Sequence, residues 1–202
     1  MRGEMHLLLR PIVSARPNAA HLAIAAIEGK EKAVTVVTQN IDGLHQSAGS
    51  TTVIELHGSL FEVGYVRSHE TWPVSSDALK RVLQSMEQFC RDRGSAAAFM
   101  EAVSPLYGKT QKGIYLPRVV LFGDFLPERA WEDASYALKK CDCMIIVGTS
   151  QVVQPAGSLS ELATSHGAPI IGIGPEPIQC DAWLRGSACE ILPRLVEAMP
   201  PV

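Results

Sequence analysis

The stretch that most constrains this chain covers residues 33–60, AVTVVTQNIDGLHQSAGSTTVIELHGSL. It opens with a run of β-branched residues over 34–38, which is typical of a strand buried on both faces in a parallel sheet. Ligands of such sheets bind beyond the carboxyl ends of the strands. The polar residues that follow, from Gln39 to Asp42, therefore lie where a ligand is expected.

A second apolar run over 53–56 ends at His57 and Gly58, which puts an imidazole at another strand end. Turn chemistry is the alternative explanation, because Asn, Asp and Gly are ordinary turn formers. A single histidine after a strand is also more often a surface or capping residue than a catalyst. The spacing alone leaves a ligand site and a pair of plain turns equally open.

The composition indicates an ordinary globular protein. The chain has 202 residues, 47% hydrophobic and 19% charged, enough for one good core and a small inserted lobe. A net charge of -3 does not favour nucleic-acid binding. No apolar run is long enough to cross a bilayer, and the first residues do not form a convincing signal peptide. We therefore expect a cytoplasmic protein that binds neither membranes nor nucleic acids.

The motifs TQNIDGLH over 38–45 and IELHGSLFEV over 54–63 resemble the core signature of the sirtuins, the NAD-dependent protein-lysine deacylases (deacetylases among them). A sirtuin-like P-N-x-x-H segment precedes them at Pro17, Asn18 and His21. On its own, His21 is better explained as a residue on the surface of a helix. The resemblance implies a transferase that takes NAD and an acylated lysine of a protein or peptide.

The predicted fold is α/β, a doubly wound parallel sheet that is Rossmann-like and of sirtuin type. Apolar strands over 117–123, 143–147 and 169–173 alternate with helices over 19–27, 128–140, 158–165 and 192–199. Asn18 is a candidate N-cap of the first of these helices, and Gly29 a stop signal.

We assign residues 1–63 and 117–202 to a discontinuous NAD-binding domain and residues 64–116 to a small, mostly helical inserted lobe. Within the lobe, GKTQKG over 108–113 is predicted to be a solvated loop. It is not a phosphate-binding loop, because the first glycine of that motif and the preceding strand are absent.

Several candidate cofactor-binding residues follow the later strands. Gly148, Thr149 and Ser150 end an apolar strand, where small residues and hydroxyls let a phosphate or ribose approach, although a plain turn is equally common. The segment GTSQVVQPAGSL resembles the G-T-S-x-x-V-x-P segment with which sirtuins bind NAD. Gly174 and Cys189 stand where the family usually has Asn and Gly near the adenosine.

The acyl-lysine site is predicted from Val120, Phe122 and Gly123, which resemble the sirtuin V-x-F-G-E segment that lines the substrate tunnel. In the family this segment also binds the substrate backbone by strand addition. The acid of the motif is Asp124 here, one methylene shorter, and a turn residue is its alternative role.

The resemblance implies a division of labour among the central residues. His57 is the general base on a ribose hydroxyl, a task that suits an imidazole because histidine ordinarily titrates near neutral pH. Asn40 orients the ribose and a water, Ile41 and Asp42 hold the nicotinamide amide, and Gln39 binds ribose hydroxyls. The products are nicotinamide, the free lysine and O-acyl-ADP-ribose.

Two family features are missing from this sequence. Sirtuins carry two C-x-x-C zinc pairs, whereas the five cysteines here form none, so we expect no zinc and no metal ligands. The G-A-G-x-S segment that holds the NAD diphosphate would precede Pro17, and no G-x-G occurs there. We therefore expect impaired deacylation. The alternatives are a catalytically inactive module that binds NAD, ADP-ribose or a peptide, and a structural remnant.

Overall fold

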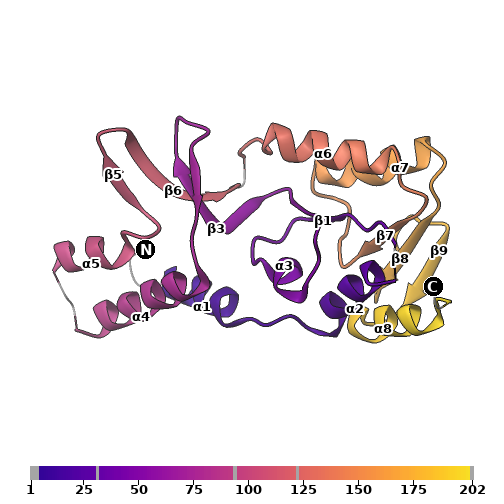
Figure 1. The fold of residues 1–202 in the computed structure, drawn as a ribbon, viewed down its shortest axis with the longest axis horizontal. Coiled ribbons are helices and arrows are strands. Elements are labelled where there is room, and N and C mark those ends of the chain that lie inside the picture. Colours follow the sequence, from indigo (N-terminus) through magenta and orange to yellow (C-terminus); the bar gives the residue numbers. More distant parts are fainter. Residues whose placement is uncertain (1–4, 31, 93–94, 122, 201–202) are drawn as a thin grey trace. The chain divides into compact units, whose positions relative to one another are not determined.

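The computed structural model describes residues 5–30, 32–92, 95–121 and 123–200 (Figure 1). The chain divides into two compact units, each assembled from separate segments. The first unit comprises Met1–Arg16, Asn40–Gly43 and His57–Phe125. The second unit comprises Pro17–Gln39, Leu44–Leu56 and Leu126–Val202.

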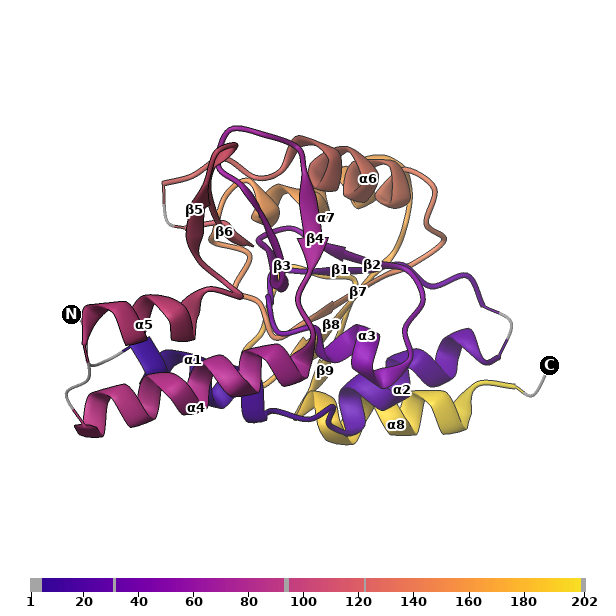
Figure 2. The ribbon, with the colours of Figure 1, turned by 60° about the vertical axis from the view of Figure 1, so that its left-hand side comes forward.

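The second unit contains the parallel strands. Strand β1 (Val36–Thr38) pairs in parallel with β2 (Val53–Glu55). Strands β7 (Met144–Val147), β8 (Ile170–Gly174) and β9 (Ala182–Arg185) form a parallel sheet in the order β7-β8-β9 (Figure 2). The predicted parallel α/β architecture is confirmed. In the described part of the chain its strands form two separately hydrogen-bonded sheets.

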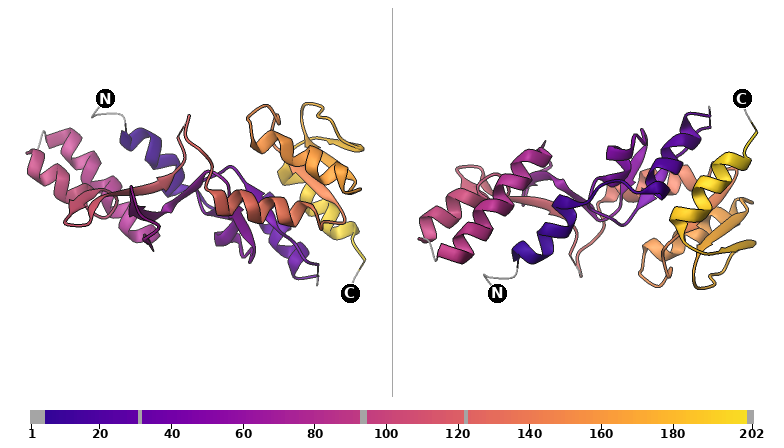
Figure 3. Two further views of the ribbon diagram at one scale, coloured as in Figure 1. Left: turned by 90° about the horizontal axis from the view of Figure 1, so that it is seen from above. Right: turned by 90° about the horizontal axis from the view of Figure 1, so that it is seen from below.

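Helices connect and cover these strands. They are α2 (Ala19–Glu28), α3 (Leu44–Ala48), α6 (Glu128–Leu138), the 3-10 helix η1 (Ala156–Ser158), α7 (Leu159–Ser165) and α8 (Ala188–Ala198). Helices α2 and α8 lie side by side in both views of Figure 3. Asn18 and Gly29 cap α2 as the sequence predicts.

Two apolar clusters stabilise the second unit. One brings Leu56 at the end of β2 together with Ala134 and Leu138 of α6. The other packs Ile173 of β8 against Leu192 of α8. Burial of the leucine and isoleucine side chains is worth roughly 1.5–3 kcal/mol each. These clusters fix the helices against the strands whose carboxyl ends carry the predicted cofactor residues.

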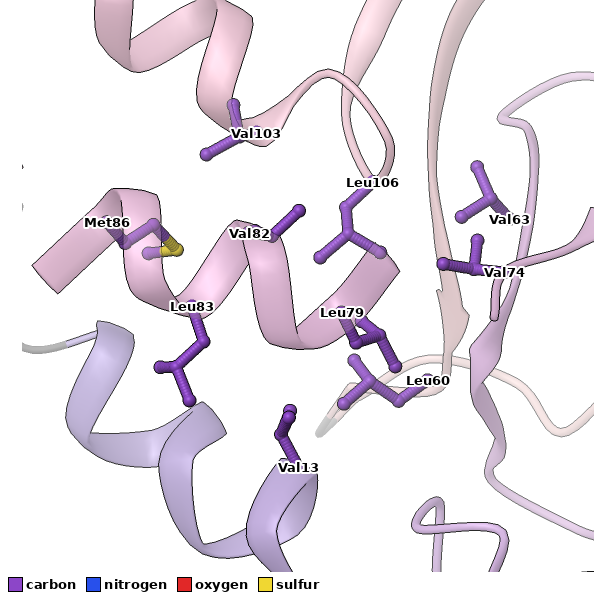
Figure 4. Close-up of a cluster of buried hydrophobic side chains, with 10 residues drawn as sticks. All are labelled: Val13, Leu60, Val63, Val74, Leu79, Val82, Leu83, Met86, Val103 and Leu106. Carbon is purple, nitrogen blue, oxygen red and sulfur yellow. The ribbon is translucent and has the colours of Figure 1, made fainter. Parts of the chain in front are cut away.

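The first unit is built on an antiparallel sheet of four strands in the order β4-β3-β6-β5. These strands are β3 (Gly58–Tyr65), β4 (Thr71–Pro73), β5 (Gly108–Thr110) and β6 (Gly113–Val119). The helices of this unit are α1 (Met5–Ser14), α4 (Ser76–Asp92) and α5 (Ala96–Val103). Its core joins Leu79 and Val82 of α4 to Val63 of β3 (Figure 4).

Two sequence predictions in this region are wrong. Of the strand predicted over 117–123, residues 117–119 form the end of β6, which runs antiparallel to β3 and β5 and not within a parallel sheet. The predicted loop over 108–113 is a β-hairpin, in which Lys109 pairs with Ile114 and Thr110 with Gly113. The hairpin supplies the outer strand that completes the antiparallel sheet, and this pairing outweighs the polar composition of the segment.

The unit that contains residues 64–116 is larger than the predicted lobe. The two predicted helices are present there, together with β4, β5 and much of β6. The pairing of β3 with β6 joins these residues to 58–63 and 117–119, and the same unit also includes Met1–Arg16 and Asn40–Gly43. Within the described residues, no helix has the length and apolar character needed to cross a bilayer.

Candidate functional site

The loop that follows β1 is anchored to β3 within the first unit. Leu60 N–H donates to the carbonyl of Ile41 at 3.1 Å. Gly43 has φ +63, and a Cβ at that position would lie 3.1 Å from the Phe61 ring. The hydrogen bond at Ile41 and the close approach of Phe61 to Gly43 both fix the backbone of this loop next to β3. It presents an exposed Asn40 and half-buried Ile41 and Asp42.

His57 lies at the point where the chain enters β3. Its carbonyl accepts a hydrogen bond from Val120 N–H at 2.9 Å, just beyond the end of β6. The next residue, Gly58, has φ +71, and a Cβ there would collide with the carbonyl oxygen of Arg118. The half-buried His57 is therefore held next to Val120, so one predicted catalytic residue and one predicted substrate residue are neighbours.

The loop after β6 is short and tightly turned. Asp124 N–H donates to Leu121 O at 3.0 Å, and the Asp124 carboxylate accepts from Leu121 N–H at 3.2 Å. Asp124 thus serves as a turn residue here. Gly123 is exposed with φ +95, and Phe122 lies outside the described residues. Leu121 and Phe125 leave 68% and 96% of their surface exposed, so this loop offers apolar contact area.

The second unit carries the predicted cofactor residues at the ends of β7 and β8. Gly148 N–H donates to Ile173 O at 3.4 Å, which ties the end of β7 to β8. Thr149 Oγ1 accepts from Gln151 N–H at 3.2 Å, and Ser150 Oγ accepts from Val152 N–H at 3.5 Å. Each hydroxyl shapes its own loop and still has its O–H to donate to a ligand.

The end of β8 meets the start of α8. The carbonyl of Gly174 accepts from Gly186 N–H and from the Trp183 indole Nε1–H, both at 3.2 Å. Ser187 caps α8 and accepts from the N–H of the half-buried Cys189. Gly148, Gly174 and Cys189 are therefore grouped in this unit, and Gln39 follows β1 in the separate β1-β2 sheet.

Trp183 is a further residue in contact with the candidate residue Gly174, and the sequence analysis did not single it out. The sequence gives little indication of a special position for this residue, because a single tryptophan in a short strand is not part of any motif. The contact with Gly174 becomes visible only in the folded sheet, where β8 pairs with β9.

The thiols of Cys141 and Cys143 are weakly acidic. Burial, followed by the nearby Asp142 carboxylate, raises the pKa of the Cys141 thiol, which donates to Leu138 O at 3.3 Å. Burial and the neighbouring Cys141 raise the pKa of Cys143 as well, although much of that residue is exposed. Metal binding requires thiolates. Across the ranges that the structure describes, no group of three or more His, Cys, Asp or Glu could hold a metal ion.

Comparison with known proteins identifies the family. Residues 4–155 match the Sir2 family. The chain belongs to the Sir2 family. Its resemblance to the sirtuins is thereby confirmed.

Curated relatives of this Sir2 chain include NAD-dependent protein deacylase 2 of Pyrobaculum aerophilum, 36% identical over 190 residues that cover 92% of this chain and 67% of the relative. The protein of the same name from Archaeoglobus fulgidus is 37% identical over 198 residues, covering 96% and 71% of the two chains.

Solved structures of Sir2 proteins also have a fold similar to that of this chain. A Sir2 protein bound to a myristoylated histone peptide matches with a TM-score of 0.66 at 37% identity, covering 91% of this chain and 72% of that one. A Sir2 homologue in complex with NAD matches with a TM-score of 0.72 at 32% identity, covering 92% and 66%.

Proposed function

We propose that this Sir2 chain removes acyl groups from protein lysines and consumes NAD in the reaction. The observation that carries the proposal is that the Asn40–Asp42 loop is hydrogen-bonded to β3 through Ile41 and Leu60, while His57 directly precedes the same strand. Relatives that are 36–37% identical over the aligned residues are NAD-dependent deacylases, and solved relatives bind NAD and acylated peptide.

Two open glycines in the second unit support binding of the adenosine end of NAD there. A Cβ at Gly148 would meet nothing within 4 Å, and one at Gly174 would meet only the Glu176 carbonyl oxygen at 3.7 Å. Backbone this open admits a ribose or phosphate. We assign cofactor binding there to Gly148, Thr149, Ser150, Gly174 and Cys189.

When bound, NAD would supply the glycosidic bond that is broken. The acyl oxygen of the substrate would replace nicotinamide at C1′ of the ribose, and with one water the products would be nicotinamide, the free lysine and O-acyl-ADP-ribose. His57 accepts a proton from a ribose hydroxyl and so makes its oxygen nucleophilic. Asn40 orients the ribose and a water through its amide. Ile41 and Asp42 bind the nicotinamide carboxamide, and Gln39 accepts hydrogen bonds from ribose hydroxyls.

The acylated peptide is assigned to Val120, Phe122 and Gly123. Val120 is adjacent to His57, which places the substrate segment beside the proposed base. The exposed Leu121 and Phe125 add apolar surface for a peptide or an acyl chain. Residues 64–116 remain the proposed inserted lobe. Cys141, Cys143, Cys180 and Cys189 are free thiols, which fits the proposed cytoplasmic location.

The test is turnover of acetylated and myristoylated lysine peptides, followed as nicotinamide release and loss of the acyl mass. His57→Ala is expected to lower kcat by on the order of a hundredfold or more, because a general base is lost. Its melting temperature should hardly change, since the half-buried ring leaves the backbone bond to Val120 in place. His69→Ala, at an exposed turn, is the matched control.

Unchanged turnover in His57→Ala would refute the role of the base. Calorimetric titration of the wild-type chain with NAD and ADP-ribose tests the alternative function. Tight binding without turnover would identify a non-catalytic binding module, and no binding would refute the proposed function altogether.

A further inference from the structure

Trp183 lies on the edge strand of the β7-β8-β9 sheet and is held there by its indole. Its Nε1–H donates to Gly174 O at 3.2 Å, and the side chain keeps 38% of its surface exposed. A hydrogen bond at one edge fixes the orientation of the ring, since rotation about either side-chain torsion would break it. Trp183 thus presents a pre-oriented aromatic surface to solvent.

The alternation of the strands shows which face of the sheet the indole covers. Leu184 packs with Ile173 in the cluster on α8, so Trp183 lies on the opposite face of β9. Gly172 and Gly174 alternate with Ile173 and belong to that same face. Over Gly172 the space is filled, because a Cβ there would lie 2.8 Å from Ile178.

Over Gly174 the space is open on that face. A Cβ added to Gly174 would have the Glu176 carbonyl oxygen as its nearest neighbour, at 3.7 Å. The Trp183 indole donates its hydrogen bond to the carbonyl of Gly174 itself. Gly148, whose N–H bonds Ile173 O, is equally open. The Trp183 indole therefore lies at the same end of the β7-β8 pair as Gly148 and Gly174. The space next to both glycines is open.

We propose that Trp183 binds the adenine of NAD and ADP-ribose by stacking, an inference that rests on the proposed function. Flat purine rings stack on aromatic side chains, and the gain does not require hydrogen bonds to the base. Cover for the sheet edge is the competing explanation. It would equally suit an aliphatic residue, and it does not require an indole fixed by hydrogen bonding beside an open glycine.

The experiment measures ADP-ribose affinity by calorimetry for the wild type, Trp183→Phe and Trp183→Leu. Loss of one stacked base weakens binding by about tenfold or more, so Leu is expected to raise Kd by that factor. Phe keeps a ring but loses the bond to Gly174 O, so its Kd is expected to lie between those of the wild type and Leu. Equal Kd values for the wild type and Leu would overturn the proposal and leave the proposed function intact.

Tryptophan fluorescence gives a second readout that does not depend on the Leu variant folding. Addition of ADP-ribose is expected to quench wild-type emission, and Trp183→Phe should abolish the quenching. Trp72→Phe, in the other unit, is the control that should retain it. Quenching that survives in Trp183→Phe would contradict the proposal. Absence of ADP-ribose binding by the wild type would overturn the proposed function together with this inference.

Discussion

At the scale of residues, glycine shapes the backbone on which the candidate catalytic side chains depend. Gly43 and Gly58 both have positive φ, and both face atoms that would crowd a Cβ. Any other residue at either position would be destabilising, because its backbone would be strained in the left-handed conformation and its Cβ would crowd the neighbouring atoms. The two glycines hold the polar loop and His57 against β3 and β6, so the geometry of the site depends on positions without side chains.

Gly58→Ala is expected to destabilise the chain by roughly 2–4 kcal/mol, from left-handed strain plus the collision with Arg118 O. Urea unfolding measures the change. Gly167→Ala is the control, because Gly167 has φ +83 and nothing within 4 Å of an added Cβ. The steric argument requires Gly58→Ala to lower the free energy of unfolding more than Gly167→Ala does. Equal decreases would contradict it.

Some site residues could be predicted from sequence and others could not, for physical reasons. The strand-end rule points to Gln39 and Gly148 as candidates because each directly follows a predicted strand, whereas Gly174 was a candidate only through the resemblance to sirtuins. Trp183 escaped that reasoning, since its role depends on a bond across two strands. The turn made by Asp124 was open as an alternative and is now explained by its bond to Leu121 N–H.

At the scale of elements, α2 shows how local sequence fixes a helix start. Asn18 Oδ1 accepts from Ala20 N–H at 3.0 Å and from His21 N–H at 3.2 Å. His21 Nδ1 accepts in return from Asn18 N–H at 3.3 Å, which completes a capping box. The role of His21 in the helix is therefore to cap it, a function usually served by Glu or Gln at this position.

Asn18→Ala should lower the free energy of unfolding by about 1 kcal/mol, the usual value of such a cap. His21→Gln should cost much less, because the Gln oxygen can accept the same bond from Asn18 N–H. Chemical denaturation of both variants tests this. If Gln at position 21 were as damaging as Ala at position 18, the capping role of the imidazole would be wrong.

The antiparallel sheet contains an aromatic cluster of Tyr65, Trp72 and Tyr115. Their ring centroids lie 5.3–6.1 Å apart in edge-to-face arrangements. Pairs of this kind contribute about 0.5–1.5 kcal/mol beyond their buried area. The cluster joins β3, β4 and β6, so side-chain packing links these three strands.

Metal analysis of the purified chain is expected to find no stoichiometric zinc, and EDTA should leave its melting temperature unchanged. The reason is the lack of paired cysteines in the sequence, since structural zinc usually requires four ligands. Trp72→Leu is the control for a loss of packing without a metal. It removes one ring of the aromatic cluster and is expected to lower the melting temperature by the same amount with and without EDTA. One zinc per chain would refute this prediction.

The antiparallel pairing was the part of the fold that sequence reasoning could not supply. The apolar residues from Val119 to Phe122 look like a buried parallel strand, and a continuous apolar run does not reveal strand direction. The pairing of Gly58 with Val119 joins residues far apart in sequence. The apolar runs of the sequence predicted β1, β2, β7 and β8. Strand β9 was not predicted, because AWLR is short and ends in Arg185.

At the scale of the whole molecule, each unit has apolar clusters of its own. The residues of one cluster, which include Leu79 and Val82, all belong to the first unit. The other two clusters, which include Leu138 and Leu192, belong entirely to the second. Cores built from separate residues can open separately, because losing one does not remove the contacts of the other.

We therefore expect unfolding in more than one step, with each step assigned to a core. Leu79→Ala and Leu192→Ala are matched, since each leucine is 1% exposed and each truncation should cost about 2–5 kcal/mol. Hydrogen exchange should show Leu79→Ala weakening protection in β3 and α4 while α8 stays protected, and Leu192→Ala doing the reverse. If either variant lowered protection equally throughout the chain, the two units would share one cooperative transition and the separate-core interpretation would be wrong.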